Sequence, residues 1–157
     1  MEREAAKPRT SEEEKLAMAQ IAEDYERIQV INNNKMMSNM MPRATPDYGS
    51  IAHTTAEIRK RANRMMDNLR LPRAEAEEAA KEPVRFNATD AAQMKAALLS
   101  LDGSIMSFIK NPIFKNPGVV EVEQAARARR DLETIVEFSQ VISREAERLS
   151  KTSVKSR

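Results

Sequence analysis

The longest regular pattern of apolar residues lies within the stretch from residue 116 to residue 150. Apolar or small residues recur there at alternating steps of three and four: Ala125, Ala128, Leu132, Ile135, Ser139, Ile142, Ala146 and Leu149. This spacing places them along one side of an α-helix about 50 Å long. Asn116-Pro117 suits the start of this helix, because Asn caps well and Pro at the first helical position loses no hydrogen bond. Such a helix needs other helices to cover its apolar side.

Three earlier segments show the same period, and together with the last they predict helices over about 11–41, 46–71, 89–110 and 117–150. Ser11 with Glu14 forms a capping-box pattern for the first helix. Thr45-Pro46 or Asp47 marks the start of the second helix, and Thr89-Asp90 with Gln93 marks the start of the third. Residues 1–10 and 151–157 are expected to be frayed, and 72–88 form a charged linker.

These segments predict an all-α protein with a single domain. Short connections at two of the three joints favour a four-helix up-down-up-down bundle, in which the long first and last helices are antiparallel neighbours. The alternative is an elongated helical dimer, in which the two long helices pair between subunits.

Composition supports the all-α reading and excludes several chemistries. Of the 157 residues, 32% are charged, 4% are aromatic and only three are glycine, which is typical of amphipathic helices. The absence of cysteine excludes disulfides, thiolate catalysis and cysteine-based zinc sites. The longest apolar run, residues 96–109, is too short to cross a bilayer. The charged N-terminus lacks the apolar core of a signal peptide, so the location is cytoplasmic only by default, and periplasmic or secreted if a leader was removed.

The second predicted helix is the basic part of the chain. Residues 43–73 carry seven basic and three acidic side chains, and four of the basic ones are close together: Arg59, Lys60, Arg61 and Arg64. At 100° per residue these four spread around the helix, and no aromatic residues interleave with them for base stacking. A solvated face is therefore the favoured interpretation, and nucleic-acid binding is the alternative.

Three polar residues fall on the apolar faces of predicted helices. Asn32 and Asn39 lie on the apolar line of the first helix, where a buried amide needs partners and can fix helix register. Asp102 lies on the apolar arc of the third helix. If buried, its carboxylate requires a cation such as Arg129 or Arg130; alternatively, Asp102-Gly103 breaks the helix and the side chain reaches water.

No set of residues suitable for catalysis is evident in the sequence. His53 is the only histidine and lies off the apolar side of its helix, so it should face solvent. Multi-histidine metal sites are thus excluded by count. A bundle that binds a small ligand, or a haem held by His53 and a methionine, is a minor alternative. We find no nucleophile–base set and no phosphate-binding loop, so we predict a protein that is not an enzyme and needs no cofactor.

The last helix has more apolar surface than one bundle face requires. Apolar residues cover about 220° of its circumference near Ile135, Phe138, Val141 and Ile142, and Val141 should point away from the bundle core. We therefore predict a second contact at these four residues. The predicted function is a helical interaction or scaffolding module whose partner is itself or another helical protein.

Overall fold

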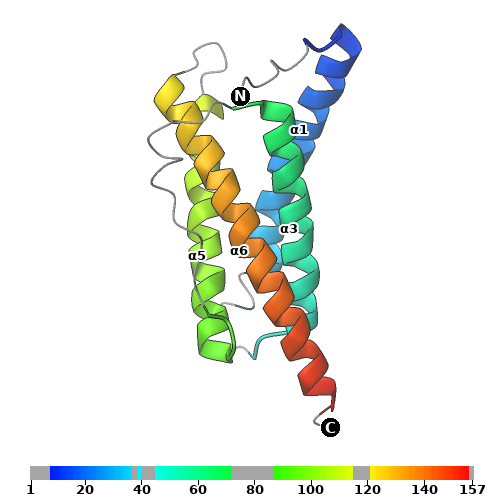
Figure 1. Cartoon of the computed structure of the whole chain (residues 1–157), viewed down its shortest axis with the longest axis vertical. Coiled ribbons are helices and arrows are strands. Elements are labelled where there is room, and N and C mark those ends of the chain that lie inside the picture. Colours follow the sequence, from blue (N-terminus) through cyan, green and yellow to red (C-terminus); the bar gives the residue numbers. More distant parts are fainter. Residues whose placement is uncertain (1–7, 37–38, 40–44, 72–86, 115–120, 156–157) are drawn as a thin grey trace, which may run out of the picture.

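The computed structural model describes residues 8–36, 39, 45–71, 87–114 and 121–155. Within these ranges the chain forms no strand, so the all-α prediction is confirmed. Its elements are α1 (Ser11–Ile31), the π-helical turn η1 (Asn32–Met36), α3 (Tyr48–Leu69), α5 (Ala91–Ile109), the 3₁₀ turn η2 (Pro112–Phe114) and α6 (Val122–Lys155). The four α-helices pack into one bundle (Figure 1).

The helix starts follow the expected capping chemistry, with two corrections. Asp47 accepts a hydrogen bond from the Ser50 N–H and Asp90 accepts one from the Gln93 N–H, which confirms both as N-caps. The capping box of α1 pairs Thr10 with Glu13, one residue earlier than predicted. The last helix begins at Val122 rather than 117; Asn116 and Pro117 lie outside the described residues.

The ends of the first and last helices differ in part from the prediction. The α-helical hydrogen bonding of the first helix ends at Ile31, and the π-helical turn η1 follows. Asparagine competes with the helix backbone through its own side-chain hydrogen bonds, which suits Asn32 to Asn34 to this local change in bonding. Asn39 is again helical, and the predicted end at residue 41 lies outside the described residues. The last helix continues to Lys155, beyond its predicted end at 150.

Contacts between helices define their directions. Tyr25 donates a hydrogen bond to the Ile109 carbonyl, and Asn32 donates one to Asp102. Residue numbers therefore increase along α1 in the direction in which they decrease along α5, so these two helices are antiparallel. The same antiparallel relation holds for α1 with α3 and for α3 with α6 through four side-chain contacts: Asp24–Arg64, Arg27–Glu57, Ser143–Ala52 and Arg129–Leu71. Consequently α3 and α5 run parallel to each other, as do α1 and α6 (Figure 1).

This topology differs from the predicted up-down-up-down order. The longest interface joins α3 and α6, and α6 also packs on α5 while α1 packs on α3, so the two outermost helices in sequence are not neighbours. Because α3 and α5 point the same way, the end of α3 and the start of α5 lie at opposite ends of the bundle. A chain the length of residues 72–86 can reach about 50 Å when extended, more than the roughly 28 Å length of α5.

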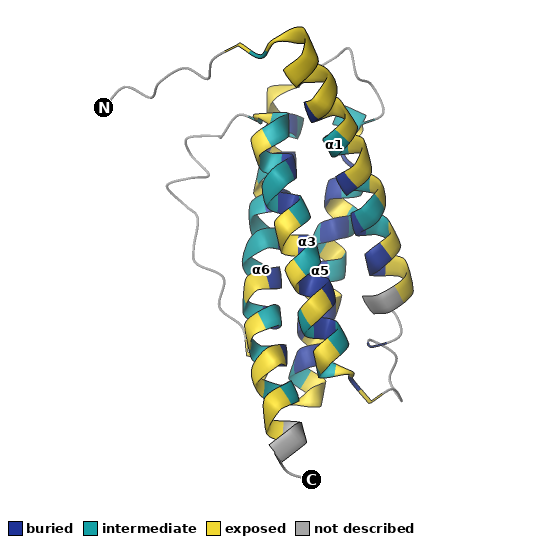
Figure 2. Cartoon of the chain, turned by 90° about the vertical axis from the view of Figure 1, so that its right-hand side faces the viewer, coloured by how far each residue is buried: buried dark blue, intermediate teal, exposed yellow. Residues whose placement is uncertain are grey.

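The core is a continuous apolar cluster to which all four α-helices contribute. Buried residues face inward along each helix and exposed residues face outward (Figure 2). The largest fully buried side chains are Ile28, Ile31, Ile51, Ile58, Met65, Met94, Leu98, Leu101, Ile105, Phe108 and Leu132. Tyr25, Phe108 and Phe114 stack with ring centroids 4.8 to 6.5 Å apart, so aromatic packing joins α1, α5 and η2. Among the described helices, none has an apolar segment long enough to cross a membrane.

Candidate functional site

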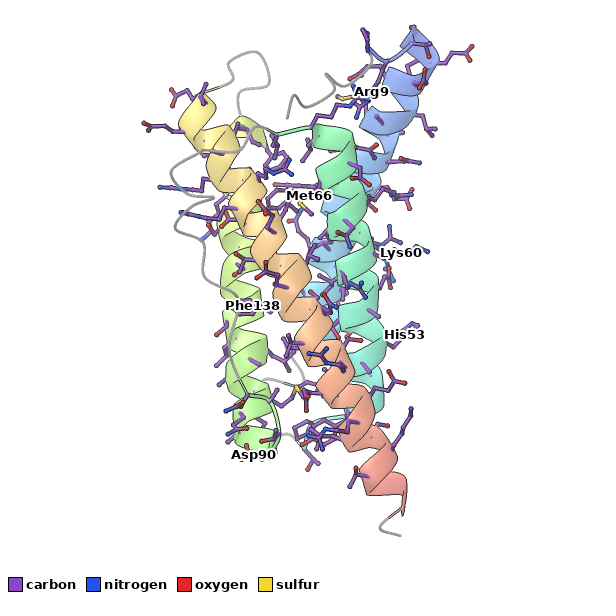
Figure 3. All side chains as sticks on the ribbon, viewed as in Figure 1. Arg9, His53, Lys60, Met66, Asp90 and Phe138 are labelled. Atoms are coloured by element: carbon purple, nitrogen blue, oxygen red, sulfur yellow. The ribbon has the colours of Figure 1, made fainter. Side chains whose placement is uncertain are left out.

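The four residues predicted to form a contact on the last helix do not share one exposed surface. Ile135 and Ile142 are fully buried in the core of the single chain. Phe138 is half-buried, packs against that core and lies between α5 and α6 (Figure 3). Val141 is half-buried. The broad apolar arc of α6 is therefore used largely within the chain, because α6 packs on both α3 and α5.

The basic run on α3 divides between solvent and an ionic network. Arg59 and Lys60 are exposed (Figure 3 labels Lys60). Arg61 and Arg64 instead bind Asp24 on α1, whose carboxylate is 0% exposed. Arg64 uses two nitrogens, with Nε 2.7 Å from Oδ2 and Nη2 2.7 Å from Oδ1, and Arg61 Nη1 lies 2.9 Å from Oδ1. These charge-assisted bonds satisfy a carboxylate that would otherwise be costly to bury.

Three more charged residues extend this network, which we call the α1–α3 charge network. Glu57 accepts hydrogen bonds from Arg61 at 2.8 Å and from Arg27 at 3.2 Å, and Glu23 lies 3.2 Å from Arg61. The network therefore contains three carboxylates and three guanidinium groups and is electrically balanced. Its contacts between the two helices join residues 30 to 40 positions apart in sequence and fix α1 against α3.

The network shifts the titration of its members. Burial works to raise the pKa of Glu57, but hydrogen bonds from Arg61 and Arg27 outweigh it and lower the pKa. Burial likewise works to lower the pKa of Arg61, and hydrogen bonds to Glu57, Glu23 and Asp24 raise it. The hydrogen bond to Asp24 is the main reason that the pKa of Arg64 is raised. All three shifts favour the charged forms, as expected of a structural ion network.

The polar residues on predicted apolar faces have partners, though not all the expected ones. Asn32 and Asn39 are buried, and Asn39 Oδ1 accepts a hydrogen bond from the Asp47 N–H at 2.9 Å. Asp102 is half-buried within a continuous helix and accepts a 2.6 Å hydrogen bond from Asn32 Nδ2. A pairing with Arg129 or Arg130 was expected only for a buried Asp102, and Arg129 donates to the Leu71 carbonyl instead. The alternative, a helix break at Asp102-Gly103, is wrong because α5 is continuous there.

The described residues offer little that could perform catalysis. His53 is exposed on the outer side of α3, as predicted (Figure 3). In the described ranges no three His, Asp or Glu side chains are grouped so as to hold a metal ion. Ser107 donates to Asp131 at 2.8 Å, and burial raises the pKa of Asp131. A nucleophilic serine needs a base that is in turn oriented by a third group, and this pair is only one hydrogen bond of such a set.

The outward side of α5 is the surface that the sequence analysis missed. α5 has only two charged residues in 19, Lys95 and Asp102, and both are half-buried. Leu99 is 57% exposed, and Ala92, Ala96 and Gly103 are also exposed. Leu16 and Met18 on α1 are exposed to a similar extent, but Glu12, Glu13 and Glu14 lie within about one turn of Leu16, so the surface around these two side chains is charged. The shortage of charge on α5, in a chain that is 32% charged overall, was the sequence signal for this surface.

The geometry of the α1–α3 charge network predicts an asymmetry between neighbouring acidic residues. Asp24→Asn should reduce the free energy of unfolding by about 1–3 kcal/mol, because two arginines lose a buried, charged acceptor. Glu23→Gln is the matched control, since Glu23 is 61% exposed, and it should change that energy by less than about 0.5 kcal/mol. Urea unfolding followed by circular dichroism measures both. Equal effects of the two substitutions would contradict the role given to Asp24.

The lowered pKa of Glu57 predicts acid sensitivity. Its folded-state pKa lies below its ordinary value of 4.5, so its stabilising effect is fully present above that pH and is lost as the pH falls through the folded-state value. Glu57→Gln should therefore flatten the decline of the thermal midpoint between pH 5 and pH 3, measured by calorimetry. The exposed Glu26 supplies the control: Glu26→Gln should decline in thermal midpoint with falling pH as steeply as the wild type. An unchanged slope in Glu57→Gln would argue against this coupling.

Comparisons with known proteins give no relative of this chain. No protein-family model matches it, and neither a curated protein nor a solved structure is detectably similar. Inferences about its function therefore depend on its own residues.

Proposed function

We propose that the protein is a non-catalytic helical interaction module that binds another protein surface through the outward side of α5. One observation supports this most directly: Leu99 is 57% exposed on a helix face that carries no exposed charge from Ala92 to Ser107. Burying such a face removes apolar area from water, and the only charged residues of α5 near it, Lys95 and Asp102, are half-buried at its edge. Contiguous uncharged apolar surface of this kind is typical of protein–protein contact sites.

The function proposed is the one expected from the sequence, but the proposed contact surface lies on α5 rather than on the last helix. The sequence pattern favoured Ile135, Phe138, Val141 and Ile142 on the last helix as the contact. Ile135 and Ile142 already fill the core of the single chain, so they have no area left to offer a partner. On α5, by contrast, the inward residues fill the core and the outward residues are additional apolar surface.

Nucleic-acid binding through Arg59, Lys60, Arg61 and Arg64 is a weaker proposal. Arg61 and Arg64 are committed to Asp24, and their charges are balanced by the carboxylates of the α1–α3 charge network. Binding of a phosphate backbone depends on cations whose charge is available to it. Substituting Arg64 would also weaken the contact between α1 and α3, so loss of binding in that variant would not by itself identify a nucleic-acid site.

A photo-crosslinking amino acid at position 99 tests the proposed function inside the cell. In the native host, the crosslinker in place of Leu99 should form a covalent adduct with a protein, because the proposal puts this side chain inside a contact. The same crosslinker in place of Leu16, which is 60% exposed on α1, is the matched control and should give several-fold less adduct. Gel shift and mass spectrometry identify the product. No adduct at position 99, or equal adducts at both positions, would refute the proposal.

A further inference from the structure

The outward positions of α5 form a repeating series. They are spaced by four, three, four, three and four residues, which keeps them on one side of the helix: Ala92, Ala96, Leu99, Gly103, Met106 and Lys110. Met106 is half-buried and the other five are exposed. We call this series the α5 stripe. It contains two large apolar side chains, each three residues away from a smaller residue in the stripe.

The order of large and small residues in the α5 stripe is self-complementary when reversed. Suppose that a second copy of α5 runs antiparallel to the first and that the twofold axis crosses the pair at the level of residue 101. Leu99 then faces the second copy's Gly103, and Ala96 faces the second copy's Met106. Each large side chain then meets a small residue, and the twofold axis repeats both pairs. A Cβ atom built on Gly103 would have no described atom within 4 Å beyond its chain neighbours and the backbone of α5 itself, so the space above this glycine is open to a side chain from outside.

A parallel arrangement has no such fit. It would place Leu99 against Leu99 and Gly103 against Gly103, so that one level is crowded and another is left with a gap. Packed interfaces tolerate neither overpacking nor voids without loss of stability. Antiparallel packing also places the positive N-terminal end of each helix beside the negative C-terminal end of the other.

We propose that the partner of the α5 stripe is a second copy of this chain, packed antiparallel through α5 in a twofold-symmetric dimer. This inference rests on the proposed function and gives it a partner. A contact in which the same patch serves both subunits must be self-complementary in shape and charge, and the stripe meets both conditions, having no exposed charge before Lys110. A single pair of helices about 28 Å long is a small interface, so the dimer dissociates in roughly the micromolar range.

Sedimentation velocity of the full-length chain, from low micromolar to several hundred micromolar, tests the dimer. The wild type should shift from monomer to dimer, and Leu99→Glu should weaken association roughly tenfold or more by placing a charge in the contact. Leu16→Glu adds the same charge at an equally exposed leucine outside the stripe and should associate like the wild type. A wild type that stays monomeric throughout, or equal weakening by the two substitutions, would overturn the inference.

Gly103→Gln separates the dimer from the stability of the monomer. Glutamine favours helix more than glycine does, and its Cβ atom would be in open space among the described residues, so the thermal midpoint at low concentration should rise. The same side chain fills the space that Leu99 of the other copy requires, so the association should weaken roughly tenfold. A variant that is more stable and still dimerises like the wild type would contradict the packing of Leu99 on Gly103.

Engineered cysteines test the direction of packing, because the natural chain has none. Leu99→Cys and Gly103→Cys chains are mixed and treated with a short thiol-specific crosslinker. The antiparallel arrangement predicts that mixed 99–103 dimers greatly exceed 99–99 and 103–103 dimers. A majority of like-with-like products would overturn it. If the chain is monomeric but the crosslinker at position 99 still captures a different protein in the cell, this inference fails and the proposed function stands.

Discussion

Burial of apolar surface between helices is the interaction on which this structure depends. α1, α3 and α6 each bury one apolar side and present charged residues to solvent, which is the usual arrangement in a soluble bundle. α5 has inward residues that fill the core, including Leu98, Leu101 and Ile105, and it also has an uncharged outward side centred on Leu99. A helix with apolar residues on two opposite sides is usually covered on both of them. The described part of this chain covers only the inner side of α5.

The α1–α3 charge network explains why the second helix is basic. α1 lacks large buried residues in its first turns, where Leu16 and Met18 are exposed and Ala17 is the small residue that faces inward. Hydrogen bonds take a larger part there: Arg9 bonds the Asn68 carbonyl at 2.5 Å, Gln20 bonds Asn68, and Asp24 binds two arginines. The positive charges on α3 thus serve the attachment of α1, and this part of the bundle is more dependent on ionic contacts than the rest.

The sequence predicted the helices and their inward faces well, since both follow from local periodicity. The predicted core residues Leu132, Ile135 and Ile142 are all fully buried, and the caps at Asp47 and Asp90 were correct. Helix direction was not predictable in this way, because a linker such as 72–88 is long enough either to turn back or to cross the bundle. The order of the helices is set by which faces fit together, and that is not a local property of the sequence.

The residues of the candidate site were harder to predict for two different reasons. Arg61 and Arg64 depend on Asp24, nearly 40 residues earlier, and a sequence pattern gives no sign of a pairing across that distance. The α5 surface was visible in the sequence as a lack of charge. A single core-facing side over residues 89–110 does not account for Leu99, because Leu99 lies on the outward side of α5.

The central claim is that the outward side of α5 is covered when the protein performs its function. Hydroxyl-radical footprinting at dilute and concentrated protein tests this claim directly, with the side-chain oxidation rate of each residue read by mass spectrometry. Leu99 and Met106 should become several-fold less reactive in the concentrated sample, while Leu16 and Met18 should keep their oxidation rates. Unchanged oxidation of Leu99 across that range, or equal protection of all four residues, would contradict it.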